Sequence, residues 1–233
     1  ALIAGYAKCG LLKKAQEVFD ESPVQDTISW NGLISGYVQH GYVEEAIKCF
    51  DQMQLEEFSA DTITFACVLK ACGNVGSAYK GQKIHAQILK DGLNVKDMAL
   101  GDALVDMYGK CGCMDDAHRV FDQTEMEVEA WNALIAGYAR QGESELTFAL
   151  FERMRKVVKP DEVTFLTILT LCTHAGLVEK GLEYFKDMII EHRISPNTKH
   201  RNCIVDLLGR GGWLDEAKAL IKRMPHLPDV AGW

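Results

Sequence analysis

The sequence has 233 residues, of which 48% are hydrophobic and 25% charged, and this composition of a folded globular chain argues against a disordered or collagen-like one. The net charge of −8 argues against a nonspecific polybasic nucleic-acid binder, although a local basic groove is compatible with it. No apolar run approaches the roughly 18–20 residues that cross a bilayer, so we expect no membrane-spanning segment.

The chain repeats one pattern from its first residues to its last. ALIAGYAKCGLLKKAQEVFD at the start is similar to ALVDMYGKCGCMDDAHRVFD from Ala103, and NGLISGYVQHGYVEEAIKCF from Asn31 is similar to NALIAGYARQGESELTFALF from Asn132. TITFACVLKACGNVG from Thr62 and EVTFLTILTLCTHAG from Glu162 form a second class. An aliphatic anchor recurs every 30 to 36 residues, at Leu2, Leu33, Val68, Leu104, Leu134, Ile168 and Ile204. A period of about 35 residues that fills the chain predicts a solenoid.

Each unit has the pattern of two helices. The first carries apolar residues at i, i+3, i+4 and i+7, as in Trp30, Leu33, Ile34 and Tyr37, with equivalent stripes from Phe65, Trp131 and Phe165. A glycine suited to the left-handed conformation that ends a helix follows, at Gly10, Gly41, Gly112, Gly142, Gly176 and Gly212.

The second helix carries a small residue four positions before an aromatic one. These pairs are Ala15/Phe19, Ala46/Phe50, Ala117/Phe121, Thr147/Phe151 and Gly181/Phe185. One such hairpin cannot bury its own apolar face, but stacked neighbours can. We therefore predict an all-α fold, an α-solenoid superhelix of helix-turn-helix repeats with six complete hairpins, a truncated leading one and no sheet.

The eight cysteines do not form a recognisable metal or disulfide pattern. Cys72 and Cys172 fall in apolar helical stripes, where a thiol behaves as a small hydrophobic group. Only Cys111 and Cys113 are close together, and no second pair stands at the spacing of a zinc site. We expect structural thiols in a reducing compartment, and neither a metal nor another cofactor.

The residues from Thr27 carry a resemblance to a known family. Their pattern, T-x-x-W-N-x-L-I-x-G-Y-x-x-x-G-x-x-x-x-A-x-x-x-F-x-x-M, resembles the pentatricopeptide repeat (PPR), whereas the W-x2-L-G-x2-Y signature of the tetratricopeptide repeat is absent. The alternating unit lengths resemble its plant-type PLS subclass, built from P, long and short units. The final VDLLGRGGWLDEAKALIKRMPHLPDVAGW is similar to the last short unit before the extension (E) motif of organellar RNA-editing factors.

The resemblance implies a division of the chain into seven units. These are a partial short unit (1–26), a P unit (27–61), a long unit (62–97), a short unit (98–127), a second P unit (128–161), a second long unit (162–197) and a last short unit (198–229), followed by the start of a C-terminal extension motif (230–233).

The resemblance further implies that each P or short unit contacts one base of single-stranded RNA. Two side chains select the base: the fifth residue of the first helix and the last residue of the unit. A neutral amide can donate and accept at the Watson–Crick edge of an unstacked base, and a carboxylate can orient that amide directly or through water. The pairs Asn31/Asp61, Asn132/Asp161 and Asn202/Asp229 would favour a pyrimidine, uracil first, and Asp26 is the surviving partner of the opening unit. Each aspartate is also explained as an ordinary helix N-cap, and that interpretation stays open.

Three units depart from this pattern. The long units have Ala66 and Leu166 at the fifth position, which cannot hydrogen-bond a base, and the resemblance gives them a role in spacing or in binding an accessory protein. The unit 98–127 offers Asp102 and Glu127, is one residue shorter than expected, and is followed by Glu129. Three acids beside a phosphate chain would repel it. Asp102 could accept from a base amine, but because of the shortened register we assign no base to that unit.

Basic residues are enriched in one column, eight positions beyond the fifth residue. The column contains Lys8, Gln39, Asn74, Lys110, Arg140, His174 and Arg210, of which four are Lys or Arg and none is acidic. We expect Lys8, Lys110, Arg140 and Arg210 to face phosphates, although basic groups also stabilise the C-terminal end of a helix. At the second position, Ile28, Ile63 and Val163 would sandwich bases, as the resemblance implies, or belong to the core.

No catalytic motif accompanies the repeats. The H-x-E and P-C-x-x-C elements of a zinc cytidine deaminase are absent, as are a P-loop and G-x-S-x-G, so we do not expect an enzyme. The chain begins inside a helical pattern without an initiator Met or a transit peptide, and we interpret it as a fragment of a longer protein.

The resemblance implies sequence-specific binding of single-stranded organellar RNA, which would specify a transcript site for C-to-U editing in a mitochondrion or plastid (chloroplast). It also implies protein partners: a multiple organellar RNA editing factor protein on the long units, and a deaminase supplied in cis or in trans. The alternative is a helical-repeat scaffold for protein–protein interaction that makes no base contacts.

Overall fold

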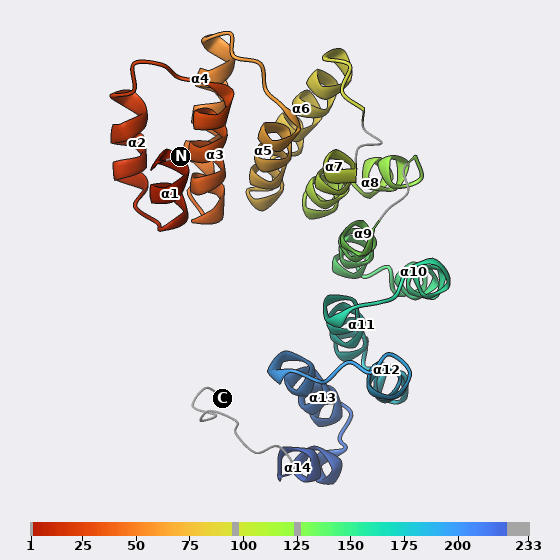
Figure 1. Ribbon diagram of the computed structural model, residues 1–233. Coiled ribbons are helices and arrows are strands. Elements are labelled where there is room, and N and C mark those ends of the chain that lie inside the picture. Colours follow the sequence, from red (N-terminus) through yellow and green to blue (C-terminus); the bar gives the residue numbers. More distant parts are fainter. Residues whose placement is uncertain (1, 95–97, 124–126, 223–233) are drawn as a thin grey trace. The chain divides into compact units, whose positions relative to one another are not determined.

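The structure is a computed structural model that describes residues 2–94, 98–123 and 127–222 (Figure 1). These residues form fourteen α-helices and no β-strand, as expected for an all-α fold. In chain order the helices are α1 (Leu2–Lys8), α2 (Leu12–Asp20), α3 (Thr27–Gln39), α4 (Val43–Leu55), α5 (Thr62–Asn74), α6 (Ala78–Lys90), α7 (Met98–Lys110), α8 (Met114–Phe121), α9 (Val128–Arg140), α10 (Ser144–Val157), α11 (Glu162–Ala175), α12 (Val178–Ile190), α13 (Thr198–Arg210) and α14 (Leu214–Lys222). Odd-numbered helices are the first helices of the hairpins and even-numbered ones the second.

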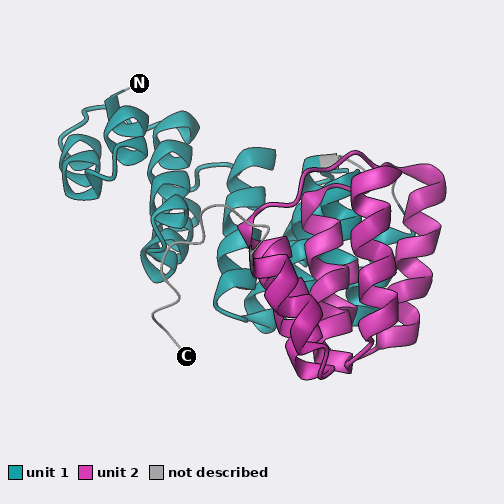
Figure 2. Cartoon of the chain, turned by 90° about the horizontal axis from the view of Figure 1, so that it is seen from below, with its two compact units in different colours: residues 1–134 teal, residues 135–233 magenta. Residues whose placement is uncertain are grey.

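The chain divides into two compact units, residues 1–134 and residues 135–233 (Figure 2). Within the first unit, α1 packs on α3, α3 on α5 and α5 on α7, so the first helices form one layer. A second helix contacts the first helix of its own hairpin and that of the next, as α4 contacts both α3 and α5. Within the second unit the same arrangement joins α11 to α13, with α12 against both.

Several first helices begin at a capping box. Asp61 accepts the backbone N–H of Thr64 at 2.9 Å, and its own N–H donates to the Thr64 hydroxyl at 3.2 Å. Equivalent pairs are Asp26/Ser29 before α3, Asp161/Thr164 before α11 and Asn197/His200 before α13. Each box satisfies N–H groups that have no partner inside the helix, which fixes where the helix starts.

The helix-closing glycines have positive φ as expected, between 67° and 80° at Gly10, Gly41, Gly112, Gly142, Gly176 and Gly212.

The predicted apolar stripes build the core. The anchors Leu33, Val68, Leu104, Leu134, Ile168 and Ile204 are at most 1% exposed. The prediction was wrong for Leu2, which is 67% exposed. Ile3 is the buried residue of that turn.

Aromatic rings join consecutive hairpins. A ring on a second helix meets a ring on the next first helix edge to face, with centroids 4.4 to 5.9 Å apart, in the pairs Phe19–Trp30, Phe50–Phe65, Phe121–Trp131 and Phe151–Phe165. Such a contact adds about 0.5–1.5 kcal/mol to the burial of the two rings. In α12 the predicted aromatic, Phe185, is only half-buried, and Tyr184 is buried in its place because it packs against both Phe148 and Phe151.

Candidate nucleic-acid interface

The aspartates predicted to contact bases lie at the N-terminal ends of first helices. Asp26, Asp61 and Asp161 are the N-caps of α3, α5 and α11, and each accepts a backbone N–H at 2.8 to 2.9 Å. The capping interpretation of these residues is therefore confirmed. It does not exclude a second contact, because a carboxylate has about four acceptor sites.

Asn31, the fifth residue of α3, contacts the cap of the following hairpin. Its Nδ2 donates to the two carboxylate oxygens of Asp61 at 3.0 and 2.9 Å, and its Oδ1 accepts from the hydroxyl of Thr64. Burial acts to raise the pKa of Asp61, but hydrogen bonds from Thr64 and Asn31 outweigh it and hold the pKa below its ordinary value. The carboxylate is thus ionised at neutral pH and can only accept hydrogen bonds.

The Asn31 amide keeps capacity for another partner. A side-chain amide has two N–H groups and two lone pairs on its oxygen, whereas Asp61 and Thr64 engage one end each. The side chain is half-buried, so part of it remains accessible. A base placed against it would meet a donor and an acceptor side by side, which can pair with the Watson–Crick edge of an unstacked base.

The structure describes three of the four residues in the other two predicted pairs. Asn132 is half-buried on α9, and Asp161 is half-buried at the start of α11. Asn202 is exposed on α13, and its predicted partner Asp229 lies outside the described residues. That Asn132 acts with Asp161 and Asn202 with Asp229 stays a prediction.

The acids of the unit 98–127 form an unfavourable cluster. Oδ1 of Asp102 on α7 is buried and has no hydrogen-bond partner among the described residues. Burial, Glu129 and Glu127, in that order, raise the pKa of Asp102 to about 6. Glu127 and Glu129 are themselves exposed at the start of α9. That these acids repel a phosphate chain stays a prediction.

The residues predicted to sandwich bases are open to solvent. Ile28, Ile63 and Val163 are 74%, 61% and 50% exposed, which excludes the alternative that they belong to the core. Beside Val163 lies a hollow of about 310 Å³, lined also by Glu162, Leu166, Asn197, Thr198 and Lys199. Exposed aliphatic side chains next to a hollow of this kind suit apolar contact with a flat ring.

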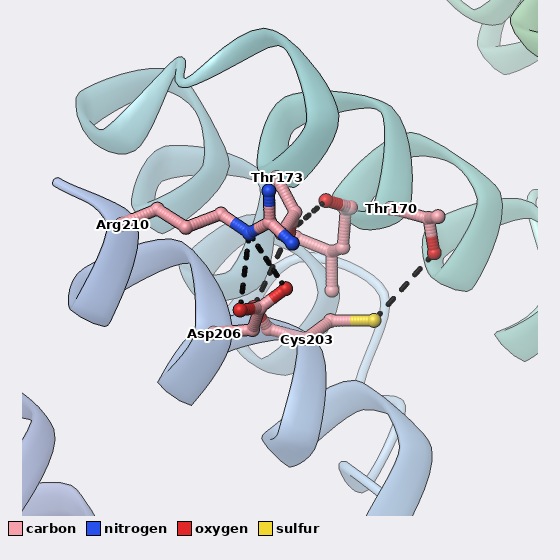
Figure 3. Close-up of polar contacts among 6 residues, drawn as sticks. Thr170, Thr173, Cys203, Asp206 and Arg210 are labelled. Atoms are coloured by element: carbon pink, nitrogen blue, oxygen red, sulfur yellow. Dashed lines mark hydrogen bonds and ion pairs between the residues drawn. The ribbon is translucent and has the colours of Figure 1, made fainter. Parts of the chain in front are cut away.

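All four predicted phosphate-facing residues lie in the last turn of first helices. Lys110 forms an ion pair with Asp106 at 2.6 Å and donates to Asn74 at 3.2 Å. The Nε of Arg210 donates to both carboxylate oxygens of Asp206 at 3.1 and 3.0 Å (Figure 3). These aspartates sit four residues earlier on the same helix, and they reduce the positive charge that Lys110 and Arg210 offer to a phosphate. Lys8 and Arg140 end α1 and α9.

The sequence analysis missed the hydroxyl residues at the third position of the first helices. Ser29, Thr64 and Thr164 complete the capping boxes, and Thr64 also reaches Asn31. The pattern Asp-x-x-Ser/Thr at the start of a helix was the available signal. It identifies the box but not the contact with the preceding hairpin.

In residues 2–94, 98–123 and 127–222, no group of three or more His, Cys, Asp or Glu side chains is arranged to hold a metal ion. None of the helices there combines the length and apolar character needed to cross a bilayer. All eight cysteines are free thiols, and burial raises the pKa of Cys72 and of Cys172 to about 11.

Family models match most of this chain. A model described as the PPR repeat family matches residues 25–74 and 126–174, and one described as the PPR repeat matches residues 1–23, 102–126, 163–191 and 201–227. The fold and the repeated hairpins agree with these matches, and the chain belongs to the pentatricopeptide repeat family.

Relatives in Arabidopsis thaliana match the chain over almost all of its length. A putative pentatricopeptide repeat-containing protein is 38% identical over 231 residues, which are 98% of this chain and 38% of the relative. A mitochondrial member is 40% identical over 243 residues, covering 100% of this chain and 35% of the relative. A chloroplastic member is 39% identical over 233 residues, covering 100% of this chain and 27% of the relative. The chain therefore spans 27% to 38% of the length of these relatives.

Solved structures of the family share the fold. The maize pentatricopeptide repeat protein PPR10, in complex with an 18-nt psaJ RNA element, superposes with a TM-score of 0.66 at 18% identity, covering 97% of this chain and 33% of PPR10. The PPR domain of Arabidopsis thaliana protein-only RNase P 1, in complex with tRNA, has a TM-score of 0.59 at 14% identity, covering 76% of this chain and 95% of that domain. The predicted fold class, an α-solenoid of helical hairpins, is thereby confirmed.

Proposed function

We propose that this chain binds single-stranded RNA in a sequence-specific manner and selects one base with each P or short unit. The observation that carries the proposal is the Asn31 amide, which is held by Asp61 and Thr64 and keeps a donor and an acceptor for a base. The exposed Ile28 and Ile63 supply apolar contacts on either side of that position. The RNA-bound PPR10, which has the same fold, supports this assignment.

We further propose that the bound RNA is an organellar transcript and that the chain marks a site for C-to-U editing. The alternation of P, long and short units and the C-terminal segment resemble editing factors, and mitochondrial and chloroplastic relatives support an organellar location. The deaminase would be supplied in cis or in trans. The long units, with Ala66 and Leu166 at the fifth position, would hold a multiple organellar RNA editing factor protein.

Selection from a randomised RNA pool tests the base contacts. The 233-residue chain should enrich sequences with uracil at the positions that face the units 27–61, 128–161 and 198–229. Asn132→Thr should shift the preference at one of these positions towards a purine and leave the others unchanged. Because few phosphates are contacted, the logarithm of affinity should fall with the logarithm of salt concentration with a slope of about −1 to −3. A chain that binds no RNA at low salt would instead be a protein scaffold.

Sequencing of organellar transcripts tests the editing role. In an organism whose gene for the parent protein is disrupted, at least one cytidine should remain unconverted in a mitochondrial or plastid transcript. The sequence upstream of that cytidine should match the selected RNA. A change in transcript length or abundance with every cytidine converted as before would replace editing by another role in RNA metabolism.

A further inference from the structure

Thr64 is the third residue of α5 and its side chain is fully buried. Its hydroxyl oxygen accepts the backbone N–H of Asp61 at 3.2 Å, as a capping box requires. The hydroxyl proton faces two acceptors, Oδ1 of Asp61 at 2.9 Å and Oδ1 of Asn31 in the preceding hairpin. An amide oxygen can only accept, so the Thr64 hydroxyl is the donor in its contact with Asn31.

Ser29 shows what a capping box does without such a neighbour. Its hydroxyl accepts the backbone N–H of Asp26 at 2.9 Å and lies 2.6 Å from Oδ1 and 2.8 Å from the carbonyl oxygen of the same residue. Among the residues that the structure describes, the hydrogen bonds of the Ser29 hydroxyl go to Asp26, and none goes to a side-chain amide. Ser29 and Thr64 thus share the capping role, and only Thr64 bonds an amide.

The two contacts of Asn31 fix the direction of its amide. The two ends of an amide have opposite hydrogen-bonding character. Nδ2 faces the Asp61 carboxylate, which can only accept, and Oδ1 faces the Thr64 hydroxyl, which donates. Turning the amide by half a turn would place its oxygen against the carboxylate of Asp61, where neither group can donate.

We propose that Thr64 is a positioning residue for base selection by Asn31, and that the long unit 62–97 thereby takes part in selecting the base that faces the P unit 27–61. This inference rests on the proposed function. Uracil presents an N–H at N3 between two carbonyl groups, whereas cytosine presents a lone pair at N3 beside an amino group. A fixed amide offers its donor and acceptor in one order and suits one of the two, and an amide that turns freely suits both. The long unit cannot hydrogen-bond a base through Ala66, but its Thr64 determines how the neighbouring unit does so.

The test compares variants that remove or keep the third-position hydroxyl. Thr64→Val keeps the shape of the buried side chain, Thr64→Ser keeps the hydroxyl, and Ser29→Ala breaks a capping box that bonds no amide. The RNA position that faces the unit 27–61 is identified as the one at which Asn31→Ala abolishes the base preference. For each variant, dissociation constants are measured for two RNAs that differ only in carrying uracil or cytosine at that position. Thr64→Val should reduce the uracil-to-cytosine affinity ratio by at least about threefold, which is the size expected for one hydrogen bond. Thr64→Ser and Ser29→Ala should retain the wild-type ratio.

The controls separate this inference from the proposed function. If Asn31→Ala removes the preference and Thr64→Val does not, Thr64 is a cap only and the inference is overturned. An equal loss of the ratio in Ser29→Ala would also overturn it, since the effect would then come from capping. A wild-type chain with no uracil preference at that position overturns both proposals.

A spectroscopic measurement removes the dependence on RNA. The side-chain amide signals of Asn31, assigned by their absence in Asn31→Ala, should shift or broaden in Thr64→Val and stay in place in Ser29→Ala. Circular dichroism establishes that each variant is folded at the temperature used. If Thr64→Val does not fold, Thr64→Ala serves in its place for both measurements. Unchanged Asn31 signals in a folded variant without the hydroxyl would contradict the inference.

Discussion

The backbone of Gly36 on α3 lies against the methyl group of Ala7 on α1. A Cβ added at Gly36 would overlap the Ala7 Cβ and come within 3.3 Å of its Cα. Neither atom can move without its helix, because both belong to the backbone or are attached directly to it. Close contact between these two first helices therefore depends on the absence of a side chain at Gly36.

Gly36→Ala should consequently destabilise the protein, by about 1–3 kcal/mol in the free energy of unfolding. Gly209→Ala on α13 is the matched control, because nothing lies within 4 Å of the Cβ that it adds. There, replacing glycine inside a helix should stabilise by about 0.5–1 kcal/mol. Urea denaturation followed by circular dichroism measures both changes. Effects of the same sign would contradict the proposed close approach.

Glu57 lies two residues after the end of α4, and its backbone has a conformation that favours glycine. Its φ is 59°, in the left-handed region. Glu57→Gly should raise the free energy of unfolding by about 0.5–1 kcal/mol, because relief of the Cβ clash exceeds the entropy that glycine gains in the unfolded chain. The neighbouring Glu56 has a φ of −85°, so Glu56→Gly removes the same charge without relieving strain and should lower stability. Thermal unfolding of the two variants should therefore shift in opposite directions.

Asp61 should matter for stability as well as for RNA. As the N-cap of α5 it bonds the backbone N–H of Thr64, and Asp61→Ala should lower the free energy of unfolding by about 0.5–2 kcal/mol at neutral pH. Ser77 occupies the N-cap position of α6 but makes no side-chain capping bond, so Ser77→Ala should change stability by less than about 0.5 kcal/mol. Chemical denaturation compares the two. Equal losses would show that the capping bond of Asp61 contributes nothing.

Repetition is what made the fold predictable from the sequence. The stripe from Trp30, the closing glycine and the second helix recur in unit after unit, so a chance match in one copy is corrected by the others. The exception is Leu2, which is exposed, whereas Ile3 beside it is buried. Tyr184 is buried in place of Phe185 because it packs against Phe148 and Phe151, and these rings belong to another hairpin.

The candidate site was predictable only where the family resemblance assigns a role to a position of the repeat. The pairing of Asn31 with Asp61 was implied by the family resemblance, and the two side chains are in contact, whereas their role in selecting a base stays a prediction. The contact of Thr64 with Asn31 was missed because local capping fully explains a threonine at that position. The pairing of Lys110 with Asp106 follows an ordinary i, i+4 pattern and could have been found. The buried oxygen of Asp102 could not, because it depends on how α7 packs against its neighbours.

Asp102 weakens the folded state at neutral pH. Burial, Glu129 and Glu127 raise its pKa from 3.8 to about 6, so the folded protein binds this proton more tightly than the unfolded chain does. Stability contributed by this group therefore increases as the pH falls from about 6 towards 4, and the penalty is fully present above about pH 6. The side chain is half-exposed, and solvent screening reduces the penalty to about 1 kcal/mol.

Asp102→Asn should accordingly raise the free energy of unfolding by about 1 kcal/mol at pH values near 7.5, and the gain should disappear near pH 4, where the wild-type carboxyl is protonated in the folded state. Asp106→Asn, one turn further along α7, provides a control of opposite sign. Asp106 pairs with Lys110 at 2.6 Å, so its neutralisation should lower stability by up to about 0.5 kcal/mol near pH 7.5. Urea denaturation of both variants at the two pH values separates the effects. A gain from Asp102→Asn that does not depend on pH would mean that packing, and not the charge of the carboxylate, limits the stability of this unit.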